Sequence, residues 1–258
     1  MPIYCTVIAL AVVVTAISVW TRRHTLRSDF DRPATLSLIM QCLALWLMAP
    51  FSQCDIGAAL HAFTGWWNVD DLIGNLFLIV AIIASYMGIA VRLTDADEIR
   101  AFVVQRILPP AIIAISLMLM FYAQSGWANR AANPAPSLLA IPGGGGLWLQ
   151  GYFVVLIAVI GYIGQMALRT LVALYRVAPG GRMTVITYFA AYAVGALASA
   201  VQLGTMFVPA IRPLNPDGAF VWILLCGCAI LSAIGSAWSW QRTLDPWRKL
   251  IKATGARL

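Results

Sequence analysis

Residues 219–240 read AFVWILLCGCAILSAIGSAWSW, and residues 241–252, which follow directly, read QRTLDPWRKLIK. The first stretch contains no Asp, Glu, Lys, Arg or His, and it is as long as the roughly 20 residues that a helix needs to cross a bilayer. The second stretch contains four basic residues immediately beyond it. An apolar run that ends in basic residues predicts a transmembrane helix whose basic end faces the cytoplasm.

Six further apolar stretches of this kind occur along the 258-residue chain, in which 61% of the residues are hydrophobic and 10% are charged. This composition is far too apolar for an ordinary soluble domain. Because backbone polar groups must be satisfied internally in lipid, each long run predicts a helix. The predicted spans are residues 3–20, 34–52, 72–91, 107–123, 147–168, 183–208 and 219–240. We therefore expect an all-α membrane protein, a bundle of seven transmembrane helices over residues 1–240, with a short basic tail over residues 241–258.

The basic residues alternate sharply between the two sides of these spans. Fifteen of the 17 lie after spans one, three, five and seven, and only Arg130 and Arg212 lie on the other side. Because basic connections stay in the cytoplasm, the N-terminus is predicted outside and the C-terminus in the cytoplasm. The first span lacks a preceding basic region, so it is expected to be retained rather than cleaved as a signal. The expected location is the inner (cytoplasmic) cell membrane.

None of the predicted spans contains an ionisable side chain other than Tyr or Cys. This argues against proton-coupled pumps, retinal proteins and intramembrane proteases, which need ionisable groups at membrane depth. The five cysteines show no spacing typical of zinc or a redox pair. We therefore expect no enzyme, no metal and no cofactor. The connection 53–71 holds the one cluster that an enzyme could use, namely Asp55, His61, Asp70 and Asp71.

Several spans contain uncharged polar side chains. The amides are Gln41, Asn75, Gln165 and Gln202. An amide in lipid is costly, so each is predicted to point into the bundle and to form hydrogen bonds there. Two interpretations stay open: the amides hold helices together, or they line a pocket for a small neutral or lipidic ligand. Gln165 and Gln202 are the best candidates for the pocket, since each lies among bulky apolar neighbours on a helix that carries glycines.

Basic residues next to the spans are predicted to contact lipid phosphates at the cytoplasmic surface. They are Arg22 and Arg23 after the first span, and Arg248, Lys249 and Lys252 in the tail. Asp245 and Pro246 together predict the start of a new helix, with Asp as the N-cap and Pro at the first helical position. The tail is therefore expected to form an interfacial helix.

Three features of the chain carry a family resemblance. They are the Arg-rich first connection, the motif WWNVDDLIGNL at residues 66–76, and Pro-Trp-Arg-x-Leu at residues 246–250. In layout and in these motifs the chain resembles an uncharacterised actinobacterial family of integral membrane proteins that are labelled as transporters. The resemblance implies a multi-pass membrane protein and no catalytic residues. Temperate phages of such bacteria encode small membrane proteins of this general kind, so a host or a phage origin stays open.

Three functions are compatible with these patterns. The first is a non-enzymatic seven-helix protein that binds a ligand, lipid or protein partner as a sensor, scaffold or exclusion factor. The odd span count, the uncharged bundle and the basic cytoplasmic face favour it. Its partners would be the bilayer, anionic headgroups, a cytoplasmic protein or a second copy, and not nucleic acid, because the charges that give +7 flank the spans. The alternatives are a transporter or channel for a neutral or hydrophobic solute, and an enzyme that acts on lipid.

Overall fold

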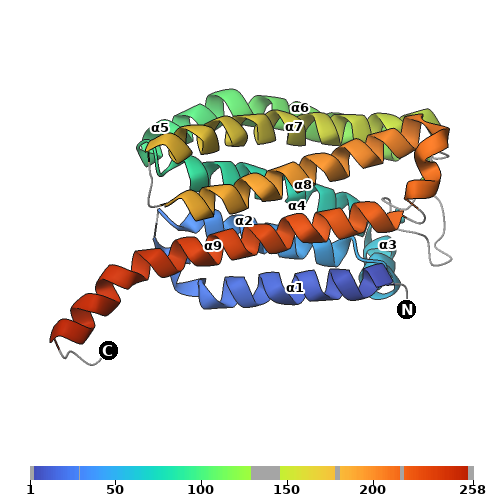
Figure 1. Ribbon diagram of the computed structural model, residues 1–258. Coiled ribbons are helices and arrows are strands. Elements are labelled where there is room, and N and C mark those ends of the chain that lie inside the picture. Colours follow the sequence, from blue (N-terminus) through green and yellow to red (C-terminus); the bar gives the residue numbers. More distant parts are fainter. Residues whose placement is uncertain (1–2, 29, 129–145, 178–180, 216–217, 255–258) are drawn as a thin grey trace.

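The protein folds into a bundle of long helices (Figure 1). The computed structural model describes residues 3–28, 30–128, 146–177, 181–215 and 218–254, with side chains up to residue 239 and without that of Cys54. All regular secondary structure in these described ranges is helical. The predicted all-α class is therefore confirmed for this part of the chain.

Six helices are long and apolar enough to cross a membrane. They are α1 (Ile3–Thr21), α4 (Val69–Ala90), the continuous run of α5 (Ala96–Phe102), η3 (Val103–Ile107) and α6 (Leu108–Gln124), α7 (Gly146–Val177), α8 (Arg182–Phe207) and the first part of α9 (Ala219–Thr254). These helices make the chain a polytopic membrane protein.

The segment predicted as the second span is shorter than expected. Helix α2 (Arg32–Leu47) has 16 residues, which corresponds to about 24 Å of helix against about 30 Å of hydrocarbon. It ends before Pro50, which cannot continue a helix. The chain then forms a π-helical turn, η2 (Gln53–Gly57), and a short helix, α3 (Ala58–Thr64). The predicted limit at residue 52 is therefore wrong.

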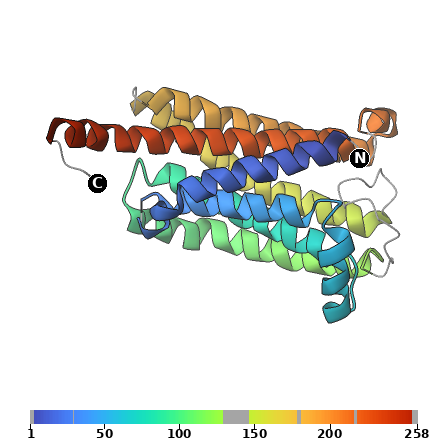
Figure 2. The ribbon, with the colours of Figure 1, turned by 90° about the horizontal axis from the view of Figure 1, so that it is seen from below.

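Most of the helices close into a ring. Neighbouring pairs follow the order α1–α2–α4–α7–α8–α9 and return from α9 to α1, while α6 packs on the outside against α7 and α4. The N-terminus and α3 lie at one end of the bundle, termed the α3 end (Figure 1). Helix α5 and the C-terminus lie at the opposite end, termed the α5 end (Figure 1). Figure 2 shows α3 projecting sideways from the bundle axis.

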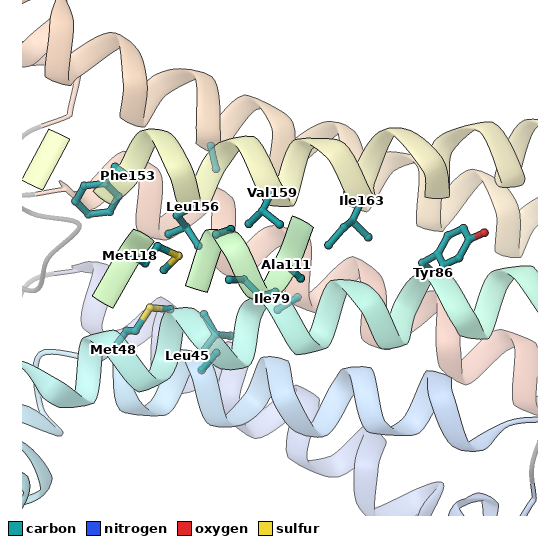
Figure 3. Close-up of a cluster of buried hydrophobic side chains, with 14 of the residues drawn as sticks. Leu45, Met48, Ile79, Tyr86, Ala111, Met118, Phe153, Leu156, Val159 and Ile163 are labelled. Atoms are coloured by element: carbon teal, nitrogen blue, oxygen red, sulfur yellow. The ribbon is translucent and has the colours of Figure 1, made fainter. Parts of the chain in front are cut away.

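The apolar core runs between α2, α4, α6 and α7 (Figure 3). Ile79, Met118 and Ile163 are fully buried there, one from each of the last three helices. Helices α2 and α4 approach closely because α4 has glycines on the shared face: a Cβ on Gly88 would lie 3.0 Å from the backbone nitrogen of Ala34. Glycine at this position therefore determines the spacing between the two helices.

The α5 end is closed by a buried arginine rather than by a surface charge. Arg22 is 1% exposed, and its NH1 donates a hydrogen bond to the Ser236 carbonyl of α9 at 2.9 Å. Its NH2 lies 3.7 Å from Asp31 Oδ1, at the start of α2. Burial lowers the pKa of the Arg22 guanidinium, whereas Tyr188 and Asp31 raise it. The predicted contact of Arg22 with lipid phosphates is therefore wrong, because the side chain turns inward to join α1, α2 and α9.

The tail differs from its prediction as well. Helix α9 continues through Asp245 and Pro246 to Thr254, so no new helix starts at Asp245. Figure 1 shows this part of α9 reaching beyond the α5 end of the bundle. The side chains of Arg248, Lys249 and Lys252 lie outside the described residues, and their contact with lipid stays a prediction.

Candidate functional site

Two buried carboxylates lie at the α3 end. Helix α4 begins at Val69, three residues before the predicted start, so Asp70 and Asp71 fall in its first turn. They are 0% and 1% exposed. The helix dipole favours acidic groups there, but taking a carboxylate out of water still costs several kcal/mol, on the order of the penalty for any buried ion. The prediction that the membrane helices lack such groups is wrong at this position, because hydropathy alone placed both residues in the preceding connection.

The two carboxylates face different surroundings. Asp70 lies against η2, where a Cβ on Gly57 would stand 3.2 Å from Asp70 Oδ2. Asp70 also lies beside the backbone N–H groups of Asp70 and Asp71 themselves. Asp71 instead accepts a hydrogen bond from Gln53 Nε2 at 3.5 Å and lies within electrostatic reach of Tyr122 and Tyr152. Asp70 thus lies against η2, while Asp71 lies closer to the tyrosines of α6 and α7, although both carboxylates are within electrostatic reach of Tyr122.

Three further polar residues gather around Asp71. Asn75 follows it by one helical turn and shares its face of α4. Tyr122 comes from the end of α6 and Tyr152 from the start of α7, with ring centroids 6.5 Å apart. All three residues are at most 1% exposed. We term Asp71, Asn75, Tyr122 and Tyr152 the acidic core.

The hydrogen bonding of the acidic core is incomplete. The Asn75 amide adjoins the Tyr152 hydroxyl. Nevertheless, neither amide atom of Asn75 nor the Tyr152 hydroxyl completes a hydrogen bond of standard geometry within the described part of the chain. Polar atoms buried in this way normally have a partner, since each unpaired one costs about 1–3 kcal/mol. The arrangement is therefore suited to a bound group that supplies the missing partner.

Two connections cover the acidic core on its outer side. The Tyr122 hydroxyl donates a hydrogen bond to the Trp67 carbonyl, and the Trp67 N–H donates to the Ala128 carbonyl at 2.8 Å. Asn68 Nδ2 donates to the Trp127 carbonyl at 3.2 Å. The turn at Asn68 has a φ of 59°, which lets the chain reverse from this cover into α4.

The cluster that an enzyme would need is not assembled. Asp55 is exposed, and the half-buried His61 stacks on Trp67 with ring centroids 3.8 Å apart. No three His, Cys, Asp or Glu side chains among the described residues gather into a group that could hold a metal ion. The acidic core is not a group of that kind, because only Asp71 is a carboxylate and its other members are the amide Asn75 and the phenols Tyr122 and Tyr152.

The four amides from the sequence have different roles. Asn75 belongs to the acidic core. Gln41 Nε2 donates a hydrogen bond to Ser37 Oγ at 3.2 Å. The Ser37 hydroxyl donates in turn to the Ala81 carbonyl at 2.8 Å, and this bond joins α2 to α4. Gln165 is exposed on α7, so the prediction that it points into the bundle is wrong, whereas Gln202 is 4% exposed on α8. No hydrogen bond joins any two of the four within the described ranges.

Sequence reasoning missed Asp71, Tyr122 and Tyr152 as partners of Asn75. A signal was present for one of them, because Asp71 and Asn75 are separated by four positions and α4 places them on one face. The tyrosines come from distant segments, and no local pattern links them to α4.

The chain was compared with models of protein families, with curated proteins and with solved structures, and no match was found. The resemblance to the actinobacterial membrane family stays a prediction.

Proposed function

We propose that this chain is a non-enzymatic, seven-helix protein of the cytoplasmic membrane that binds a small polar ligand at the acidic core, from the outer side. The observation that carries this proposal is the buried Asn75 amide and Tyr152 hydroxyl, which adjoin each other near the Asp71 carboxylate but complete no hydrogen bond of standard geometry within the described residues. Burying polar and ionisable groups in an otherwise apolar bundle costs free energy. Such groups in membrane helices are typically functional.

The positions of the chain ends support a seven-helix topology. The N- and C-termini lie at opposite ends of the bundle (Figure 1), so the chain would cross the membrane an odd number of times. Helix α2 packs between α1 and α4 in the ring, and its short length can be matched by local thinning of the bilayer. The connections at the α5 end include His24, Asp97 and most of the basic residues, which favours a cytoplasmic α5 end.

A cysteine-labelling experiment tests this topology. His24, Thr64 and Asp97 are exposed, and each is replaced by Cys in a background in which the five native cysteines are Ala. We expect a membrane-impermeant maleimide to label Thr64→Cys in intact cells, and to label His24→Cys and Asp97→Cys only after permeabilisation. Labelling of His24→Cys and Thr64→Cys from the same side would show that α2 does not cross the membrane.

The surroundings of Arg23 support the prediction that this side chain contacts anionic lipid at the α5 end. Unlike Arg22, it is exposed, and its guanidinium carbon lies 4.2 Å from the ring centroid of Trp20, which is 68% exposed. An arginine stacked on an exposed tryptophan is typical of the level of the lipid headgroups. This face would also be the one that meets a cytoplasmic protein partner.

A thermal-shift screen tests the binding role itself. The purified chain is heated in detergent with panels of inorganic ions, amines and neutral polar solutes, and Asn75→Leu is compared with Gln202→Met. Both variants remove a buried amide with an atom that completes no hydrogen bond among the described residues, but only Asn75 belongs to the acidic core. We expect at least one solute to raise the melting temperature of the wild type and of Gln202→Met, and not that of Asn75→Leu. If no solute separates the two variants, the acidic core is not a binding site.

A further inference from the structure

We propose that α3 lies within the bilayer leaflet at the α3 end, parallel to the membrane plane, with Phe63 inserted into uncharged lipid. Helix α3 projects sideways from the bundle axis, so it extends away from the other helices (Figure 2). Phe63 is 90% exposed, which is the largest exposed fraction of any large apolar side chain among the described residues. Because a phenyl ring loses much favourable apolar burial when water surrounds it, Phe63 requires an apolar partner outside the bundle.

The length of α2 places α3 at the depth of the lipid. Helix α2 begins with the exposed Arg32 at the α5 end, and a basic side chain in this position stays at the headgroups. Its 16 residues cover about 24 Å of the roughly 30 Å of hydrocarbon, so α2 ends about 6 Å before the far edge. The segment that follows, η2 and α3, therefore begins within the leaflet, and a tilt of α2 would place it deeper still.

The two sides of α3 differ in polarity. His61 and Thr64 are three positions apart and share one side, and the His61 ring stacks on Trp67 with ring centroids 3.8 Å apart. Because successive residues of a helix turn by about 100°, Ala59 and Phe63 lie on nearly the opposite side from His61. Both are exposed. The side of α3 that is turned away from the bundle contact is therefore apolar.

The composition of the connection identifies the kind of lipid. Residues 48–68 contain no Lys or Arg, in contrast to the connections at the α5 end. Because anionic headgroups are attracted by Lys and Arg, lipid charge does not hold α3 in the leaflet. Phe51 is 38% and Trp66 42% exposed, one on each side of α3 along the chain, and exposed aromatic side chains of this kind favour the boundary between headgroups and acyl chains. Insertion should therefore be independent of lipid charge and of salt.

Spin labelling measures the depth of α3. The full chain, with its five cysteines replaced by Ala, carries a nitroxide at Phe63→Cys in phosphatidylcholine vesicles. The references are Ile112→Cys, which replaces a side chain that is 59% exposed within α6, and Asp97→Cys in α5, which replaces an exposed carboxylate. Oxygen concentrates in apolar surroundings, whereas a neutral water-soluble nickel complex is excluded from them. The ratio of oxygen to nickel collision rates should be about tenfold higher at Phe63→Cys than at Asp97→Cys, towards the value at Ile112→Cys.

A photo-crosslinker gives an answer even if the cysteine-free chain does not fold. Benzoylphenylalanine replaces Phe63 in the chain with its native cysteines, and mass spectrometry identifies what it reaches on irradiation. We expect adducts with phosphatidylcholine from position 63 and none when the same residue replaces Asp97. Equal collision ratios at positions 63 and 97 would overturn the proposal, and so would crosslinks from position 63 to a second copy of the chain in place of lipid. If added phosphatidylglycerol raises the collision ratio at position 63, the assignment to uncharged lipid is wrong.

Discussion

Replacing Arg22 by methionine is expected to lower the free energy of unfolding by about 3–5 kcal/mol, the usual cost of removing one partner of a buried ion pair. Asp31, which is 5% exposed, would be left without its cation at 3.7 Å. The hydrogen bond from Arg22 NH1 to the Ser236 carbonyl would be lost as well, and with it one link between α1 and α9. Unfolding by denaturant in detergent micelles, followed by tryptophan fluorescence, measures this loss.

The adjacent arginine is a matched control for this prediction. Arg23 is exposed, so Arg23→Met should change the free energy of unfolding by less than about 1 kcal/mol. The double variant Arg22→Met/Asp31→Leu should recover much of the loss, since it leaves no buried charge behind. Equal losses from Arg22→Met and Arg23→Met would show that the buried pair does not stabilise the bundle.

Gly88→Val is expected to destabilise the protein by about 3 kcal/mol, through overpacking between α4 and α2. A Cβ at this position would lie 3.0 Å from the backbone nitrogen of Ala34 and 3.2 Å from its Cα. These are backbone atoms of the first turn of α2, so no flexible side chain can move aside. The two helices would have to separate, which also weakens the other contacts between them. The same unfolding measurement gives the size of the effect.

Gly161 provides the opposite case on α7. A Cβ there meets no atom within 4 Å. Gly161→Ala should therefore raise the free energy of unfolding by about 0.5–1 kcal/mol, because alanine restricts the unfolded chain and favours the helix. If Gly88→Val and Gly161→Ala had similar effects, the close approach of α2 to α4 would not be a determinant of stability.

Much of the fold can be predicted from the sequence because a lipid environment leaves a long apolar run few alternatives to a helix. The six helices able to span a membrane all lie within predicted apolar stretches or extend them. The positions of helix ends are harder to predict, because they depend on local features that an average over a window hides. Pro50 ends α2 early, and the continuation of α9 through Pro246 overrides a sequence pattern that is typical of a helix start.

The candidate site could be predicted only in part. The sequence predicts that Asn75 is buried, since an amide inside an apolar run must find a partner. The sequence alone predicts Asp71 in the connection before α4 and Arg22 at the lipid surface, because a charged residue next to an apolar run is usually solvated. Their burial depends on neighbours that come from distant segments, such as Tyr152 and Ser236. Tertiary contacts of this kind leave no periodic pattern in a single sequence.

The closure of the ring by α9 against α1 also determines when the fold can be completed during synthesis. Arg22 and its acceptor Ser236 are separated by 214 residues, so at about 5–20 residues per second the ribosome needs roughly 10–40 s to supply the second after the first. During that interval α1 sits in the bilayer with a cation whose carbonyl partner has not yet been made. Helix α1 thus lacks this contact with α9 until α9 has been synthesised, and the bundle stays open on that side during the interval.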